Sequence, residues 1–149
     1  MFRKTLNILI VTSTFAFQFS FAGNHPEENK DSQNPFLNHF NTLINYSTIT
    51  ADEIKSATDI TIENAKKSLE KIYNIEKDKR NFENTALAFD DIYNDLSSVE
   101  GPIYLMANVH PDNDIRNTSN SEISVFSKFF NDLTLDEKLY IVFRQGLNH

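Results

Sequence analysis

Between residues 85 and 109, apolar side chains recur at alternating steps of three and four residues. The members of this series are Phe89, Ile92, Leu96, Val99, Ile103 and Met106. Such steps place side chains on one face of an α-helix, and a series of this length is typical of long helices that pack together at a shallow angle. The series therefore predicts a long helix that needs at least one helical partner.

The pair Gly101-Pro102 lies inside this predicted helix. A proline within a helix lacks the N–H that would bond to the carbonyl four residues back, and its ring crowds the preceding turn. We therefore expect a kink or a break near Ser98, with Ile103 and Met106 still reaching the core beyond it.

A second helical pattern begins at Thr50. The T-x-x-E sequence that ends at Glu53 predicts a capping box at the start of this helix. Small and apolar side chains then form one stripe: Ile54, Ala57, Thr58, Thr61, Ala65, Leu69 and Ile72. The charged run at 76–80 that follows is most simply a solvated turn.

A third helical pattern starts at about Ser121 and continues towards the end of the chain. Its apolar side chains are Ile123, Phe126, Phe130, Leu133, Leu135, Leu139 and Val142. Thr134 and Glu137 form a second T-x-x-E sequence, which predicts another capping box. Since no strand-like alternation of useful length and no internal repeat are present, the sequence predicts an all-α fold of long antiparallel helices in an up-and-down arrangement.

The first 22 residues have the pattern of an export signal. Arg3 and Lys4 precede a mostly apolar stretch, and small residues stand at the two positions that signal peptidase inspects before a cut after Ala22. The alternative is a membrane anchor, but several polar residues interrupt a stretch already near the short end of the roughly 17–25 residues that a span requires. We expect cleavage and a periplasmic or secreted protein.

Residues 23–34 contain no apolar side chain except Pro26 and are predicted to be a disordered linker. The helical domain is then expected to cover residues 35–149. Its first apolar anchor comprises Phe36, Leu37, Phe40, Leu43 and Ile44.

Composition removes several classes of function. The chain has no cysteine and only three glycines, so thiol chemistry, cysteine-bound metals and glycine-rich phosphate loops are excluded. The formal net charge of −7 becomes −9 after removal of residues 1–22, which carry two positive charges and no negative ones. We therefore expect no nucleic-acid partner and no stable membrane anchor.

The four histidines lie at positions 25, 39, 110 and 149, and no two are four residues apart. A zinc hydrolase helix needs two such imidazoles and an adjacent glutamate, so HExxH is absent. Asp112 and Asp114 alternate as in a hard-metal loop, but the glycine and the distal glutamate of a calcium loop are missing. The sequence thus predicts no catalytic, cofactor-binding or metal-binding residue and no cofactor.

Several segments together resemble the amino-terminal region of the thimet-oligopeptidase (oligopeptidase A) family. The similarity extends over about residues 34–143, and the segments that carry it are Asn34–Leu37, Ile54 with Ala57, Phe82–Thr85, His110–Arg116, Ser119–Phe129 and Leu139-Tyr140. The turn sequence F-E-N-T and the stretch P-D-N-D-I-R are moderately specific when they occur together.

This resemblance implies a helical part of a zinc metallopeptidase that cuts short peptides within a deep channel. The zinc and the catalytic residues of that family belong to an HExxH part that this chain lacks, so no catalytic residue carries over. The chain is then an inactive amino-terminal fragment whose partner is the missing catalytic half, or else an independent helical interaction module. A fragment is expected to leave its end around Leu139, Val142 and Phe143 uncovered.

Overall fold

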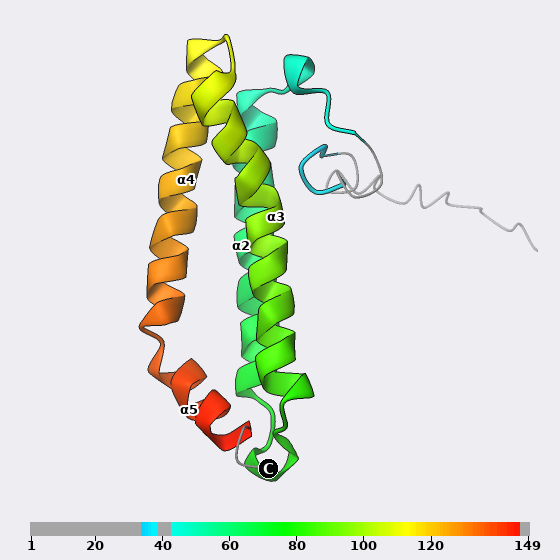
Figure 1. The fold of residues 1–149 in the computed structure, drawn as a ribbon, viewed down its shortest axis with the longest axis vertical. Helices are drawn as coiled ribbons and strands as arrows, with labels where there is room; N and C mark the ends of the chain where they lie inside the picture. The colour runs from blue at the N-terminus through cyan, green and yellow to red at the C-terminus, as the bar shows by residue number, and fades with distance from the viewer. Residues whose placement is uncertain (1–33, 39–42, 147–149) are drawn as a thin grey trace, which may run out of the picture.

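The computed structural model describes residues 34–38 and 43–146 (Figure 1). Four α-helices are present in this part: α2 (Ala51–Tyr73), α3 (Ala88–Val109), α4 (Asn113–Thr134) and α5 (Glu137–Gly146). Short helical turns η1 (Tyr46–Thr48), η2 (Lys77–Lys79) and η3 (Glu83–Leu87), the last of π type, lie between or before them. The described part contains no strand, so the predicted all-α class is confirmed.

The three long helices form an elongated up-and-down bundle (Figure 1). The chain descends in α2, ascends in α3 and descends again in α4, and each of these helices contacts the other two. The short α5 then turns back beneath the bundle, beside the connection between α2 and α3. The predicted antiparallel arrangement is therefore confirmed.

The core consists mainly of the stripes that the spacing predicts, but Leu135 of the third stripe is 83% exposed, so its predicted burial is wrong. Leu96 and Ile103 of α3 are fully buried, and so are Ile54 of α2 and Phe126 of α4. The small residues Thr58, Thr61 and Ala65 of the α2 stripe are buried as well. Burial of each large apolar side chain contributes about 1.5–3 kcal/mol, so packing between the helices stabilises them more than their intrinsic propensities do.

The predicted capping box at the start of α2 is confirmed. The Thr50 hydroxyl accepts a hydrogen bond from the Glu53 amide (3.2 Å), and the Glu53 carboxylate accepts one from the Thr50 amide (2.8 Å). Two of the otherwise unpaired groups at this end are thereby satisfied, which defines where α2 begins.

The segment before α2 packs onto it through Asn34 and Phe36. Asn34 is buried, donates to the Glu53 carbonyl (2.9 Å) and accepts from the Phe36 amide (3.0 Å), and Phe36 is fully buried. Asn34 is therefore part of the packed structure, although we predicted that the linker extends to it. Leu43, predicted to be part of the apolar anchor, is 99% exposed, so that prediction is wrong. Phe40 and residues 1–33 lie outside the described residues.

α3 continues through Pro102, so of the predicted kink or break the break does not occur. Its upper half leans towards α4 (Figure 1). Ile103 and Met106 beyond the proline are both buried, and their packing holds the second half of the helix in the bundle. Tertiary burial therefore outweighs the hydrogen bond that Pro102 removes.

α4 begins at Asn113, well before the predicted start at Ser121. The Asp112 carboxylate caps the helix by accepting from the Asp114 amide (2.7 Å). The first two turns are mostly Asn, Ser and Thr, with Ile115 and Ser119 as the buried positions. These turns therefore contain too few apolar residues for their spacing to indicate a helix.

Arg116 holds the turn between α3 and α4. Its place at this helix junction in the sequence predicts contacts either with helix-end carbonyls or with an acidic neighbour such as Asp112 or Asp114, and the structure shows the carbonyls. Its guanidinium donates to the carbonyls of His110 and Pro111. These are charge-assisted hydrogen bonds to the end of α3.

Arg116→Ala is expected to lower the free energy of unfolding by about 1.5–3 kcal/mol, the usual contribution of hydrogen bonds to charged groups. Because Arg116 is partly exposed, the lower end of that range is expected. Urea unfolding followed by circular dichroism measures this loss. The neighbouring Asn117→Ala, which removes an exposed side chain without these contacts, is the matched control, and equal stability of the two variants would contradict the assignment.

Candidate functional site: an aromatic groove beside α5

The position of α5 is determined first by Asp136, which precedes it. The Leu139 amide donates to the Asp136 carboxylate (3.0 Å), so Asp136 caps α5. The predicted cap at Thr134 is wrong, because the Thr134 hydroxyl donates instead to the Phe130 carbonyl within α4 (2.9 Å). α4 extends through Thr134, which leaves only two residues between the helices.

Asp136 also joins α5 to α2. The Tyr73 hydroxyl donates to the Asp136 carboxylate at 2.6 Å. Burial alone would raise the pKa of Asp136, but the hydrogen bonds from Tyr73 and from the amides of Leu139 and Lys138, with the Lys138 charge, hold it below its usual value. Burial, together with the hydrogen bond to the Asp136 carboxylate, raises the pKa of Tyr73. Tyr73 is thus the donor in this pair and Asp136 the charged acceptor.

Acidification is expected to remove the stabilisation that this contact provides. Because the pKa of Asp136 is lower in the folded state, the contribution is complete above the ordinary aspartate pKa of about 3.9 and is lost as the pH falls through the lower folded value. The melting temperatures of the wild type and Asp136→Asn, measured from pH 7 to pH 2.5, should therefore converge at the acid end. A difference that does not change over this range would contradict the role of the Asp136 charge.

Arg80 holds the far end of α5. It donates to the carbonyls of Ile75 (3.0 Å) and Tyr73 (3.2 Å) and to the side-chain oxygen of Gln145. We predicted that the run 76–80 is a solvated turn, and this is correct for its exposed members but not for Arg80. Nothing in the local sequence distinguishes Arg80 from its charged neighbours, because its partners lie in α5 and at the end of α2.

Gly146 permits the close approach of α5 to the start of η3. A Cβ atom added at this position would lie 2.5 Å from the Thr85 hydroxyl oxygen and 3.3 Å from the Asn81 carbonyl oxygen. With α5 seated in this way, Leu139 and Val142 are buried at 4% and 3% exposure. The expectation that this end lacks its cover is wrong for both residues, since α5 packs them against the chain's own bundle.

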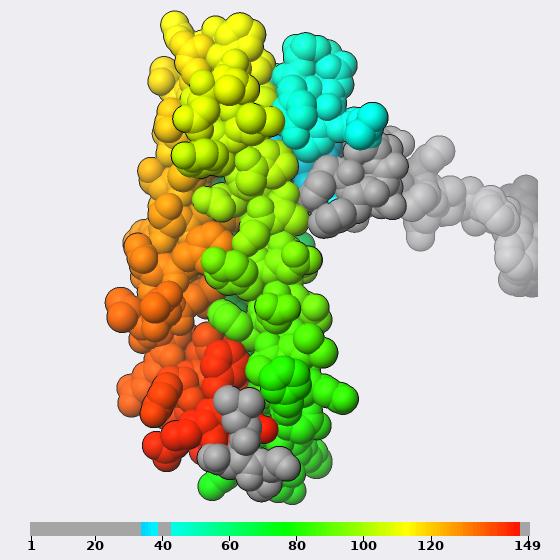
Figure 2. Space-filling model, viewed as in Figure 1, coloured from blue at the N-terminus to red at the C-terminus, as the bar shows by residue number. Residues whose placement is uncertain are grey.

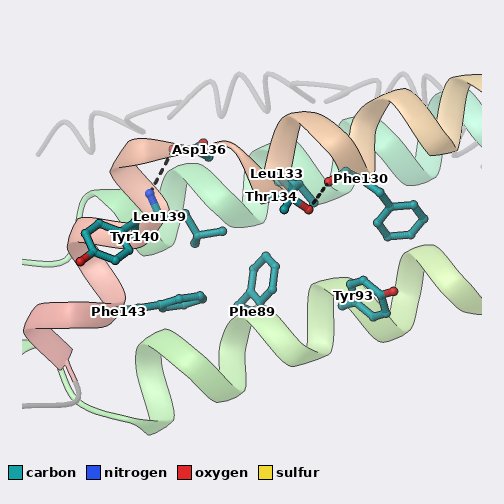
Figure 3. A pocket seen from close by; sticks show the side chains of 9 residues that line it. All are labelled: Phe89, Tyr93, Phe130, Leu133, Thr134, Asp136, Leu139, Tyr140 and Phe143. Carbon is teal, nitrogen blue, oxygen red and sulfur yellow. Dashed lines mark hydrogen bonds between the residues drawn. The ribbon is translucent and has the colours of Figure 1, made fainter.

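A groove remains open between α5, the end of α4 and the start of α3 (Figures 2 and 3). Its volume is about 380 Å³, within the range of small ligand sites. The side chains that line it are mostly aromatic: Phe89, Tyr93, Phe130, Leu133, Thr134, Asp136, Leu139, Tyr140 and Phe143. α4 and α5 form one wall and α3 the other (Figure 3).

Two ring contacts cross this groove. Phe89 of α3 meets Phe143 of α5 edge-to-face at 5.3 Å between ring centroids, and Tyr93 of α3 meets Phe130 of α4 at 5.1 Å. Tyr93 and Tyr140 are nevertheless 51% and 62% exposed. Such pairs position the walls, while the exposed ring faces remain open to another molecule.

No pattern in the sequence predicts this groove as a whole. Phe89 belongs to the predicted apolar series, and Tyr93 follows it four residues later. This spacing places both rings on one side of α3, and it is the signal in the sequence for a second, aromatic face on this helix. The participation of α5 depends on Asp136, Arg80 and Gly146, whose partners are distant in sequence.

The acidic turn at residues 110–114 has a structural arrangement. The His110 ring nitrogen accepts a hydrogen bond from the Asp112 amide (3.1 Å), and the Asp112 carboxylate caps α4. Within the ranges 34–38 and 43–146, no group of three or more His, Asp or Glu side chains is placed to hold a metal ion. His25, His39 and His149 lie outside those ranges.

No family model, curated protein or solved structure matches this chain. No helix in the described part is long and apolar enough to cross a membrane. The predicted signal peptide at residues 1–22 lies outside that part, and export to the periplasm or medium remains a prediction.

Proposed function

We propose that this chain is a non-catalytic helical binding module built like the amino-terminal helices of the thimet-oligopeptidase family. The observation that carries the binding role is the open groove, in which five aromatic side chains converge while the core around them is closed. A concave pocket lined mainly by aromatic side chains, with a few polar groups among them, is the usual form of a binding site.

The residues that resemble the family support the relationship through their structural roles. Asp112 and Arg116, from the stretch His110–Arg116, build the α3–α4 turn, and Asn84 and Thr85 bond to Asn81 at the start of η3. These motifs define how the helices connect, which is what a shared helical scaffold requires.

The second candidate is an inactive amino-terminal fragment that needs a separate catalytic half. The open groove is compatible with it, because a catalytic half would cover exposed rings. The burial of Leu139 and Val142 of α5 against the chain's own bundle favours the independent module. The nucleotides after the codon for His149 distinguish the two: an HExxH reading frame supports the fragment, and an unrelated neighbour supports the module.

The purified chain, with or without residues 1–22, is expected to hydrolyse no peptide in the presence of Zn²⁺. Its sequence has no pair of histidines four residues apart and no HExxH, so the ligands and the general base that activate zinc-bound water in that family are missing. A quenched fluorescent peptide measures turnover. Chelator-sensitive activity that follows the protein through gel filtration would contradict the non-catalytic role.

A further inference from the structure

We propose that the partner of this groove is a basic amphipathic helix that lies between α3 and α4 and extends the bundle to four helices. This inference rests on the proposed binding role and adds the chemistry of the partner. Three observations support it. An exposed face continues from the groove along α3, the charges beside this face are mainly negative, and no described cation lies over the rings of the groove.

The uncovered face continues from the groove along α3. Phe89, Tyr93, Ser97, Glu100 and Tyr104 succeed one another at steps of four, four, three and four residues, so they share one side of this helix. Phe130 and the half-buried Ile123 lie on the α4 side. Figure 2 shows the seam between α4 and α3 continuing above α5. A partner helix placed along two such helices uses the same packing as a four-helix bundle.

The charge beside this face is mainly negative. Three acidic residues follow or flank the groove residues: Asp90 and Glu100 of α3 and Glu137 of α5. Arg144 is the basic residue on this side of α5. The whole chain has a formal net charge of −7. A second copy or an anionic lipid surface would be repelled, whereas a basic partner would be attracted.

In the described part of the chain, no lysine or arginine lies over the aromatic rings of the groove. On the α2 side of the bundle, Lys66 lies over the Phe129 ring (5.9 Å) and Lys138 over the Tyr73 ring (5.7 Å). None of the five groove rings has such a contact with a described Lys or Arg. A lysine or arginine of the partner would form on this side the contact that the chain's own lysines form on the other.

The test uses a synthetic 22-residue amphipathic helix, the length of α3, with a leucine face, flanking lysines and one tryptophan. Because the chain contains no tryptophan, the emission reports on the peptide alone. A matched peptide carries glutamate at every lysine position. The basic peptide is expected to bind at least about tenfold more tightly than the acidic one at low salt, with a difference that shrinks as salt is added.

Variants of the chain locate the binding. Tyr93→Ala is expected to weaken binding of the basic peptide by about fivefold or more, as for an aromatic anchor. Leu105→Ala removes an exposed apolar side chain about a third of a turn away around α3, and it is expected to leave the affinity unchanged. Asp90→Asn is expected to weaken binding about twofold and to reduce its salt dependence. Asp91 projects from α3 about 100° away from Asp90, so Asp91→Asn is the charge control.

Equal binding of both peptides, or full affinity in Tyr93→Ala, would overturn the proposed partner while leaving the folded, non-catalytic module intact. Sedimentation of the chain as a dimer that Tyr93→Ala dissociates would instead identify a second copy as the occupant. Binding to phosphatidylglycerol vesicles through Tyr93 would identify a lipid surface, and either result would overturn the proposal. Cleavage of the peptide, detected by mass spectrometry, would instead contradict the proposed function itself.

Discussion

Replacing Phe126 with alanine is expected to lower the free energy of unfolding by about 3–5 kcal/mol. Phe126 is fully buried in α4, the helix that contacts both other long helices. Alanine would leave a cavity there, because side chains on three separate helices cannot all move inward without losing their own contacts. Since domains of this size are stable by only about 5–15 kcal/mol, this single change removes a large share of the total.

Urea unfolding followed by circular dichroism measures the effect of Phe126→Ala. The control is Val125→Ala, one residue earlier on the same helix, where a 43% exposed side chain is removed and a change within about 0.5 kcal/mol is expected. If Phe126→Ala does not fold, Phe126→Leu provides a smaller cavity and a measurable intermediate loss. A loss below about 1 kcal/mol in Phe126→Ala would contradict the packing of α4 against both neighbours.

Gly146→Ala is expected to destabilise the chain by about 1–3 kcal/mol, the usual cost of inserting a group into a packed contact. The new methyl carbon would lie 2.5 Å from the Thr85 hydroxyl oxygen, so either α5 or η3 has to move. The displacement would strain the contacts of Arg80 with Gln145 and of Tyr73 with Asp136, which position the same helix.

Gly101→Ala is the matched control for Gly146→Ala and is expected to have the opposite sign. Gly101 is exposed inside α3, and an added Cβ atom meets no other atom within 4 Å. Alanine there restricts the unfolded chain and favours the helix, which should stabilise the protein by about 0.4–1 kcal/mol. Thermal melts of the two variants measure both effects, and a shift of the same sign in both would contradict the close contact at Gly146.

Much of the bundle follows from local sequence patterns. The α3 series, the α2 stripe and the cap at Thr50 are signals within single helices, and each is confirmed. The carbonyl contacts of Arg116, one of the two kinds of contact predicted for it, are confirmed for the same reason, because both carbonyls lie within six residues. Patterns of this kind identify which face of a helix is buried.

The remaining features depend on contacts between residues that are distant in sequence. Asp136 caps α5 in place of Thr134, and it is also the partner of Tyr73, 63 residues away. Arg80 and Gln145 are separated by 65 residues, so neither stands out in the sequence. These contacts hold α5 beside α3 and so form the groove. Because they join residues that are distant in sequence, no local pattern predicts it.

The relationship to the thimet-oligopeptidase family remains a prediction that rests on the similar sequence segments. The roles of Asp112, Arg116 and Thr85 in the turns explain why such residues would be kept in a helical scaffold, whether or not a catalytic half accompanies it. The burial of Leu139 and Val142 supports a part that folds without that half.

The most direct test of this independent fold is the unfolding of the purified chain alone. Far-ultraviolet circular dichroism follows the helices, and near-ultraviolet circular dichroism follows the packing of the tyrosine and phenylalanine rings. The account predicts one cooperative transition, with the same urea midpoint by both methods. A chain that keeps its helices but loses the near-ultraviolet signal in native buffer, or that melts without a sharp transition, would contradict it and would support a fragment that needs another part to complete its core.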